Sequence, residues 1–99
     1  LRDMARATIR MVSSSVDAYV KQDVDMAEKV IAADDVVDGY FDKIKGQLIE
    51  RIAQGEGDGE ATLDLLMIAK YYERIGDHAT NIAEWVEFSV TGVHKTEVT

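Results

Sequence analysis

Two amino acids are missing altogether from this 99-residue chain: it has no cysteine and no proline. Without cysteine there is no disulfide, thiolate metal ligand or cysteine nucleophile, and the composition fits a reducing compartment. Without proline nothing in the sequence forces a helix to kink or break, so long uninterrupted helices are favoured. An apolar run of the roughly 18 residues that span a membrane is also missing, so we expect no direct membrane insertion.

Positive charge is scarce. Only 11 Lys and Arg residues stand against 19 Asp and Glu residues, which gives a net charge of −8. Nucleic-acid binding requires clustered basic residues, so this balance argues against nucleic acid as a main partner. The hydrophobic fraction of 46% is too high for a disordered chain, and at this length it predicts one globular domain with one core.

Apolar residues recur at steps of three and four in three long segments, which is the pattern of amphipathic helices. The three expected helices span about residues 1–21, 25–53 and 59–91. Short connections make consecutive helices run antiparallel. The predicted fold is therefore an all-α antiparallel three-helix bundle over residues 1–92, followed by a flexible tail over 93–99.

Local signals mark the expected helix ends, and apolar stripes mark the expected core faces. Asp25, with Glu28 three residues later, is typical of a capping box at the start of the second helix. Asp58 is the expected N-cap of the third helix and Gly92 its expected C-cap. The stripe of the first helix comprises Leu1, Met4, Ala5, Thr8, Val12, Val16 and Tyr19. The stripe of the second comprises Met26, Val30, Ala33, Val37, Phe41, Ile44 and Leu48. The stripe of the third comprises Leu65, Ile68, Tyr72, Ile75, Ala79, Ile82, Ala83, Val86 and Val90.

Two acidic pairs share one spacing: Asp34 with Asp38 in the second expected helix, and Glu73 with Asp77 in the third. Side chains at i and i+4 lie about 6 Å apart on one helix face, where like charges repel each other. Antiparallel neighbouring helices can bring both pairs together, and a cation would then turn the repulsion into coordination. Four oxygen ligands suit hard or borderline cations such as Mg²⁺, Mn²⁺, Fe or Ca²⁺, so the pattern predicts a metal site.

The simpler alternative is a solvated acidic surface, in which Glu73 pairs with Arg74 or Lys70. Projected on the third helix, the acidic stripe points away from the main apolar face, as a solvated surface would. His78 projects away from that stripe and is typical of a lone surface histidine. Trp85 also projects off the core centre and fits either a partner-binding anchor or a half-buried ring.

Residues 72–84 read YERIGDHATNIAE, and this stretch resembles the signature of the PhoU family, bacterial regulators of phosphate transport and of the phosphate regulon. The resemblance extends over the whole chain. DVDMA at residues 23–27 resembles the turn before the second helix of a PhoU repeat, and DDVVD at 34–38 resembles its acidic segment. WVEFSVTG at 85–92 is similar to the closing turns of the family's last helix.

The resemblance implies half of a larger protein, because PhoU proteins consist of two tandem three-helix repeats. This chain matches one repeat and its ending is similar to the C-terminal one, which agrees with a start at Leu1 rather than at Met. The resemblance also implies metal binding through acidic helix motifs, with iron, manganese, magnesium or zinc as candidate ions. Asn81 and Glu84 are candidates for further contacts. The implied ligands are Asp34, Asp38, Glu73 and Asp77.

The function is implied in the same way. The family represses phosphate-starvation signalling by linking the Pst phosphate transporter to a sensor histidine kinase, and it has no enzymatic activity of its own. We therefore expect a non-catalytic regulatory adaptor that represses the response when phosphate is plentiful. Its expected partners are the ATPase subunit of the transporter, the kinase and a second copy in a homodimer. Its expected location is the cytoplasm, at the inner face of the membrane through its partners.

Two other classes of protein are alternatives to the adaptor. A di-metal oxidase in a ferritin-like bundle needs Glu-x-x-His on two helices. Here His78 follows Glu73 by five residues and no second such motif exists, so the pattern argues against that enzyme. A ligand-free structural or dimerisation bundle is compatible with the stripes and stays open as the alternative.

Overall fold

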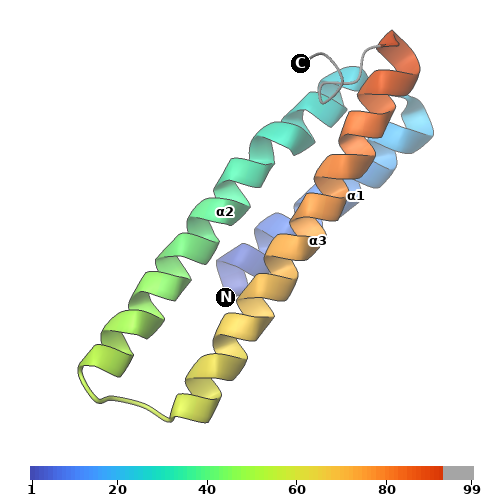
Figure 1. Ribbon diagram of the computed structural model, residues 1–99. Helices are drawn as coiled ribbons and strands as arrows, with labels where there is room; N and C mark the ends of the chain where they lie inside the picture. Colours follow the sequence, from blue (N-terminus) through green and yellow to red (C-terminus); the bar gives the residue numbers. More distant parts are fainter. Residues whose placement is uncertain (93–99) are drawn as a thin grey trace.

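The computed structural model describes residues 1–92, which form three helices. The helices are α1 (Arg2–Lys21), α2 (Val24–Ala53) and α3 (Gly59–Thr91). They run up, down and up, and each packs against the other two (Figure 1). No strand occurs in the described range, so the prediction of an all-α antiparallel three-helix bundle is confirmed. The flexible tail predicted for residues 93–99 lies outside the described residues.

The connection between α1 and α2 is short because one residue reverses the chain and the next caps the new helix. Gln22 adopts the left-handed conformation with φ 53°, and its side-chain Nε2 donates a 2.7 Å hydrogen bond to the Tyr19 carbonyl. Asp23 then accepts a 3.1 Å hydrogen bond from the backbone N–H of Met26. The predicted capping box at Asp25 is therefore wrong, because the helix already begins at Val24 and its cap is Asp23.

The connection between α2 and α3 uses glycine where the backbone turns. Gly55 and Gly57 have φ values of 71° and 84°, which side-chain-bearing residues rarely adopt. Asp58 accepts a 3.0 Å hydrogen bond from the N–H of Glu60, so the predicted N-cap of α3 is confirmed. Gly92 ends α3 in the left-handed conformation with φ 77°, as predicted.

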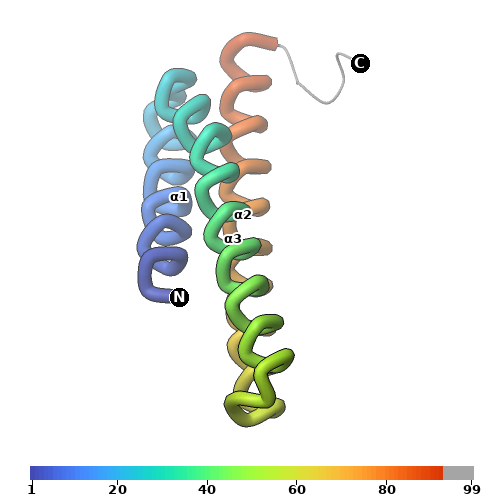
Figure 2. The backbone as a smooth tube through the Cα atoms, turned by 90° about the vertical axis from the view of Figure 1, so that its left-hand side faces the viewer, coloured from blue at the N-terminus to red at the C-terminus, as the bar shows by residue number. Residues whose placement is uncertain are grey.

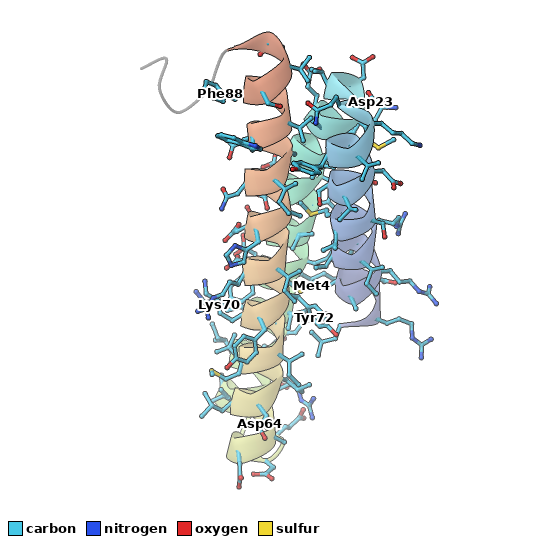
Figure 3. All side chains as sticks on the ribbon, turned by 90° about the vertical axis from the view of Figure 1, so that its right-hand side faces the viewer. Met4, Asp23, Asp64, Lys70, Tyr72 and Phe88 are labelled. Carbon is cyan, nitrogen blue, oxygen red and sulfur yellow. The ribbon has the colours of Figure 1, made fainter. Side chains whose placement is uncertain are left out.

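The core lies along the axis between the three helices, and α3 contributes mainly small residues to it. Met4 of α1 and Val30 and Val37 of α2 are at most 2% exposed. Figure 3 shows Met4 on the side of α3 that faces α1. The buried residues of α3 are Thr62, Ala69, Gly76, Ala79, Ala83, Val86 and Glu87. Small side chains let α3 approach its neighbours closely.

The predicted core stripes of α1 and α3 are wrong in part. On α1 the buried residues include Met11, Ser15 and Ala18, whereas Val12 and Val16 of the predicted stripe are 37% and 49% exposed. On α3 the predicted stripe centres about 230° around the helix from Glu73, but the buried residues centre near 290°. The reason is that each helix has two adjacent apolar faces, and periodicity alone averages them.

The second apolar face, which we call the α1–α3 apolar face, remains exposed on this chain. On each of the two helices it lies on the flank turned away from α2. Its members are between 37% and 54% exposed. They are Val12, Val16, Tyr19, Ile68, Ile75 and Ile82. Large apolar side chains gathered on one flank are the usual mark of a surface that another body covers.

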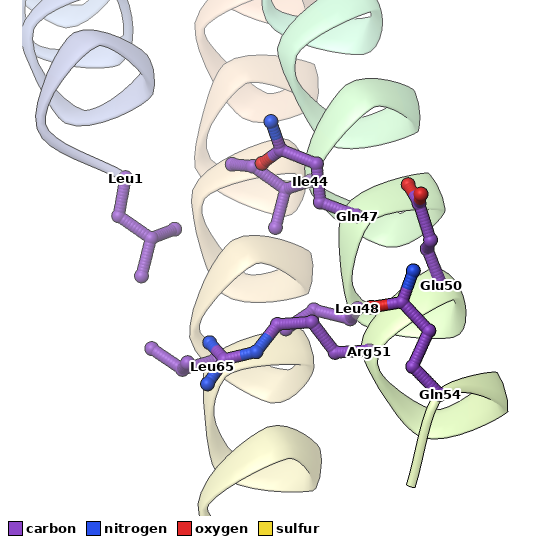
Figure 4. Close-up of a pocket in the computed structure, with 8 residues that line it drawn as sticks. All are labelled: Leu1, Ile44, Gln47, Leu48, Glu50, Arg51, Gln54 and Leu65. Carbon is purple, nitrogen blue, oxygen red and sulfur yellow. The ribbon is translucent and has the colours of Figure 1, made fainter. Parts of the chain in front are cut away.

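One end of the molecule consists of the α2–α3 hairpin alone. With 20 residues α1 is much shorter than α2 with 30 and α3 with 33, so the hairpin end extends beyond the start of α1 (Figure 2). A cavity of about 580 Å³ opens there, and Figure 4 shows Leu1 approaching it from the start of α1. Leu48 of α2 and Leu65 of α3 line its apolar side. Among the described helices none is both long and apolar enough to cross a membrane.

Candidate metal centre

Three carboxylates from two helices converge near the middle of the α2–α3 interface. Asp34 and Asp38 project from α2 and Asp77 projects from α3. One carboxylate oxygen of each lies within 4.8 Å of the corresponding oxygens of the other two. The i, i+4 spacing on α2 supplies two groups from one helix face, and the antiparallel partner helix supplies the third. We call these three residues the acidic cluster.

Gly76 explains why α3 comes so close to the acidic cluster. A Cβ atom added at Gly76 would lie 3.5 Å from Cγ1 of Val37, 3.6 Å from Sδ of Met11 and 3.8 Å from Oδ1 of Asp34. These are ordinary van der Waals distances, so a methyl group fits but a longer side chain has neighbours on three sides. The glycine therefore lets the α3 backbone pack directly against the carboxylate of Asp34.

The buried face of α3 corrects the expected direction of its acidic stripe. Because the buried face of α3 centres nearer to the acidic stripe than the predicted face does, Glu73 borders the core instead of pointing away from it, and Asp77 lies further out on the same side. Asp34 and Asp38 are half-buried, and Asp77 is exposed. The cluster is thus open to solvent on one side and walled by the bundle on the other.

Electrostatics make the cluster unfavourable by itself. Burial raises the pKa of Asp34, and the charges of Asp38 and Asp77 raise it further. The pKa of Asp38 is also raised, first by burial and then by Glu73 and Asp77. In addition, Oδ1 of Asp34 is buried without a hydrogen-bond partner among the described residues. A buried, unpaired carboxylate oxygen among like charges calls for a proton or a cation.

Glu73, the fourth predicted ligand, lies beside the cluster but is directed to a lysine. Oε1 of Glu73 forms a 2.6 Å salt bridge with Nζ of Lys70, and the side chain of Glu73 is only 16% exposed. The same Nζ lies 5.2 Å from the ring centre of Phe41 on α2. Lys70 lies on the side of α3 away from α1 (Figure 3). Glu73 still raises the pKa of both α2 aspartates, so it lies within their electrostatic reach.

Asn81 and Glu84, the candidates for further contacts, lie outside the acidic cluster, and so does His78. His78 and Asn81 are exposed and Glu84 is half-buried. Among the described histidine and acidic residues, only the three aspartates form a group close enough to share an ion. Sequence reasoning missed the role of Gly76, although a glycine inside a long helix, where it costs about 1 kcal/mol relative to alanine, was a usable signal.

The chemistry of the cluster is that of a cation site built from oxygen atoms. Carboxylates are hard ligands, and three of them around one point suit Mg²⁺, Mn²⁺ or iron, with water completing the coordination. A cation would neutralise the mutual repulsion and give the buried Oδ1 of Asp34 a partner. The residues present therefore fit a metal ion.

Fold and site together define an all-α helical bundle that carries an oxygen-only acidic cluster between two helices. Compared with known families, residues 1–86 match the model of the PhoU domain. The chain belongs to the PhoU family, and the resemblance stated from residues 72–84 is thereby confirmed.

Curated relatives agree with this assignment. The chain is 38% identical over 97 residues to "Phosphate-specific transport system accessory protein PhoU homolog 1" of Thermotoga maritima, covering 98% of this chain and 42% of the relative. It is 38% identical to a PhoU homolog of Zymomonas mobilis, covering 97% and 40%. It is 32% identical to the PhoU protein of Escherichia coli K12, covering 93% and 38%. The chain thus spans about 40% of the length of these relatives, consistent with a single repeat. No solved structure matches it significantly.

Proposed function

We propose that this chain is part of a non-catalytic regulatory adaptor for bacterial phosphate uptake and phosphate-regulon signalling. In this proposal it couples the ATPase subunit of the Pst transporter to a sensor histidine kinase and represses the response when phosphate is plentiful. It would act in the cytoplasm, at the inner face of the membrane. Family membership supports the proposal, as do relatives that are named accessory proteins of a phosphate-specific transport system.

The second part of the proposal is that the acidic cluster binds a metal ion, with iron, manganese, magnesium and zinc as the candidates. The observation that carries it is the convergence of Asp34, Asp38 and Asp77, together with the unpaired buried oxygen of Asp34. Glu73 becomes a fourth ligand if it exchanges its Lys70 partner for the ion. Such binding would favour one arrangement of the α2–α3 surface, and a partner that contacts this surface would respond to it.

The adaptor proposal is tested by direct binding to the purified ATPase subunit and to the cytoplasmic part of the kinase. We expect surface plasmon resonance to detect both complexes, with at least one complex tighter when the chain carries Mn²⁺. The control is the variant in which Asp34, Asp38 and Asp77 are all asparagine. Absence of both complexes would overturn the adaptor proposal. Equal affinity of the chain and the variant would leave the adaptor and remove its coupling to metal.

We further propose that the chain forms a homodimer through the α1–α3 apolar face. Charged substitution there should prevent the burial of apolar surface that drives association. We expect the chain to sediment as a dimer and Ile75→Glu, at a position 42% exposed, to sediment as a monomer. Ile49→Glu is the matched control, because Ile49 is 56% exposed and belongs to the hairpin end. A chain that is monomeric at high concentration, or a dimer that survives Ile75→Glu, contradicts the proposal.

The rival to the metal proposal is a ligand-free structural or dimerisation bundle. The two differ in one measurable quantity, because a ligand that binds only the folded state must raise the melting temperature. A melting temperature that does not change with Mn²⁺, Fe²⁺, Mg²⁺ or Zn²⁺ favours the structural bundle. A dimer by itself fits both, so the metal titration decides between them.

A further inference from the structure

A second concave site lies in the groove between α1 and α2, which run side by side (Figure 2). The groove holds a cavity of about 340 Å³, near the lower end of the volumes typical of small-molecule sites. Its floor is apolar and consists mostly of small side chains, so a flat or slender apolar group can rest on it. The floor residues are Ala7, Met11, Val30, Ala33 and Val36.

Four hydrogen-bond donors stand around this apolar floor. Arg10 and Ser14 come from α1, and Lys29 and Tyr40 come from α2. Neither cation forms a salt bridge with a described residue; the salt bridge found in that range joins Lys70 and Glu73. The guanidinium and ammonium groups are therefore available to a ligand.

The two hydroxyl groups are available as well. Serine and threonine in helices commonly donate to their own backbone, as Thr8 and Ser15 do here at 2.8 Å. The hydroxyl of Ser14 makes no such bond within the described residues, and the phenol of Tyr40 makes none either. Ser14 lies one turn from Arg10 on α1, so its hydroxyl and the two cations can contact one anion. Tyr40 lies 11 residues from Lys29, about 16 Å along α2, and stands at the other end of the groove.

The sign of the charge at this groove is opposite to that of the molecule. The chain carries a net charge of −8, yet none of the residues that line the cavity is acidic. The acidic cluster lies in a different groove, between α2 and α3. An anion in the α1–α2 groove would therefore contact the positive charges of Arg10 and Lys29, and no carboxylate that lines the groove would repel it.

We propose that the groove between α1 and α2 binds a small organic oxyanion, with the anionic head held by Arg10, Lys29 and Ser14 and an apolar group resting on the floor toward Tyr40. Phosphate monoesters and carboxylates share this chemistry. Arg10 offers the paired N–H groups that match two oxygens of either head group, and Lys29 adds a compact positive charge. The apolar floor distinguishes such a ligand from a bare inorganic anion.

The test is calorimetric titration of the full chain with phenyl phosphate in metal-free buffer, so that a metal ion in the acidic cluster cannot recruit the probe. Arg10→Gln with Lys29→Gln should weaken binding about tenfold or more, because it removes both charged contacts. The matched control is Arg6→Gln with Lys43→Gln, which changes the net charge equally on the same two helices at exposed positions outside the cavity. Circular dichroism establishes that both variants keep their helices.

A second arm tests the floor. Val36→Ser at an exposed floor position should weaken phenyl phosphate several-fold and leave inorganic phosphate unchanged. Benzyl alcohol, which has no charged head group, should bind far more weakly than phenyl phosphate. Comparison of phenyl phosphate with phenylacetate shows which anionic head group is preferred, and either preference supports the proposal. No binding of phenyl phosphate and phenylacetate at millimolar concentration, equal losses in the two double variants, or equally tight binding of inorganic phosphate would overturn it.

Discussion

Replacement of Asp34, Asp38 and Asp77 together by asparagine is expected to abolish metal uptake by this chain. Asparagine keeps the size of each side chain but removes the negative charge that attracts the cation. With Mn²⁺ at about 100 times its Kd, the native sequence should gain about 2.7 kcal/mol of stability, and the triple variant should gain none. Elemental analysis of the dialysed protein gives the stoichiometry, and thermal melts with and without Mn²⁺ give the stabilisation.

In metal-free buffer the same triple variant should melt at a higher temperature than the native sequence. The three carboxylates repel each other, and Oδ1 of Asp34 is buried without a partner. The matched control replaces three aspartates outside the cluster, Asp3, Asp17 and Asp64, by asparagine. This control has the same net charge and should keep metal uptake, and its metal-free melting temperature should not rise, because Asp3 lies in the first turn of α1, where its charge favours the helix. Full metal uptake by the cluster variant would remove the ligand assignment.

The dependence on pH provides an independent check of the same prediction. The pKa values of Asp34 and Asp38 are raised above the usual value near 3.8. Between that value and the raised pKa, the folded state binds more protons than the unfolded state, so these groups make the metal-free protein less stable as pH rises through the window. Metal uptake should change in the opposite direction, because protons compete with the cation at lower pH. The cluster variant should lack both effects.

The sequence was sufficient for the helices and for much of the acidic cluster, because both depend on local spacing. An i, i+4 pair necessarily shares a helix face, and short connections necessarily make neighbouring helices antiparallel. These two rules predict, without any tertiary detail, that Asp34 and Asp38 lie near Asp77, as they do in the structure. The partner of Glu73 was left open between Lys70 and Arg74, although helix spacing favours Lys70 at i−3 over Arg74 at i+1, which lies on another face. The structure has the Lys70 pair.

The core faces of α1 and α3 were harder to predict for a physical reason. Hydrophobic periodicity reports which residues avoid water, but it does not report which neighbour covers them. Ile75 and Val16 belong to the apolar stripes yet remain exposed on this chain, while Ser15 and Gly76 are buried. The misplaced stripe also explains why the acids of α3 were expected to point away from the core. Small residues, which carry little hydrophobic signal, fix where the helices touch.

Gly76 is therefore the position at which an added side chain tests the close contact between α2 and α3 most directly. Gly76→Ala should be neutral or stabilising by up to about 1 kcal/mol, because alanine favours the helix and its Cβ meets Val37, Met11 and Asp34 at ordinary contact distances. Gly76→Leu should be destabilising by about 1–3 kcal/mol or more, because the extra carbons have no space between α2 and α3. For a domain of this size, that corresponds to a loss of about 4–8 °C in melting temperature per kcal/mol.

The two substitutions together separate helix propensity from close packing. Leucine and alanine are both good helix formers, so a large difference between them measures the contact between helices alone. The leucine should also push α3 away from Asp34 and thereby weaken Mn²⁺ uptake, whereas the alanine should leave the uptake unchanged. Urea unfolding of both variants gives the stability difference, and Mn²⁺ titration at a temperature where both are folded gives the affinity. If Gly76→Leu is as stable as Gly76→Ala, then α3 does not lie against Asp34, and the acidic cluster loses the geometry on which its chemistry depends.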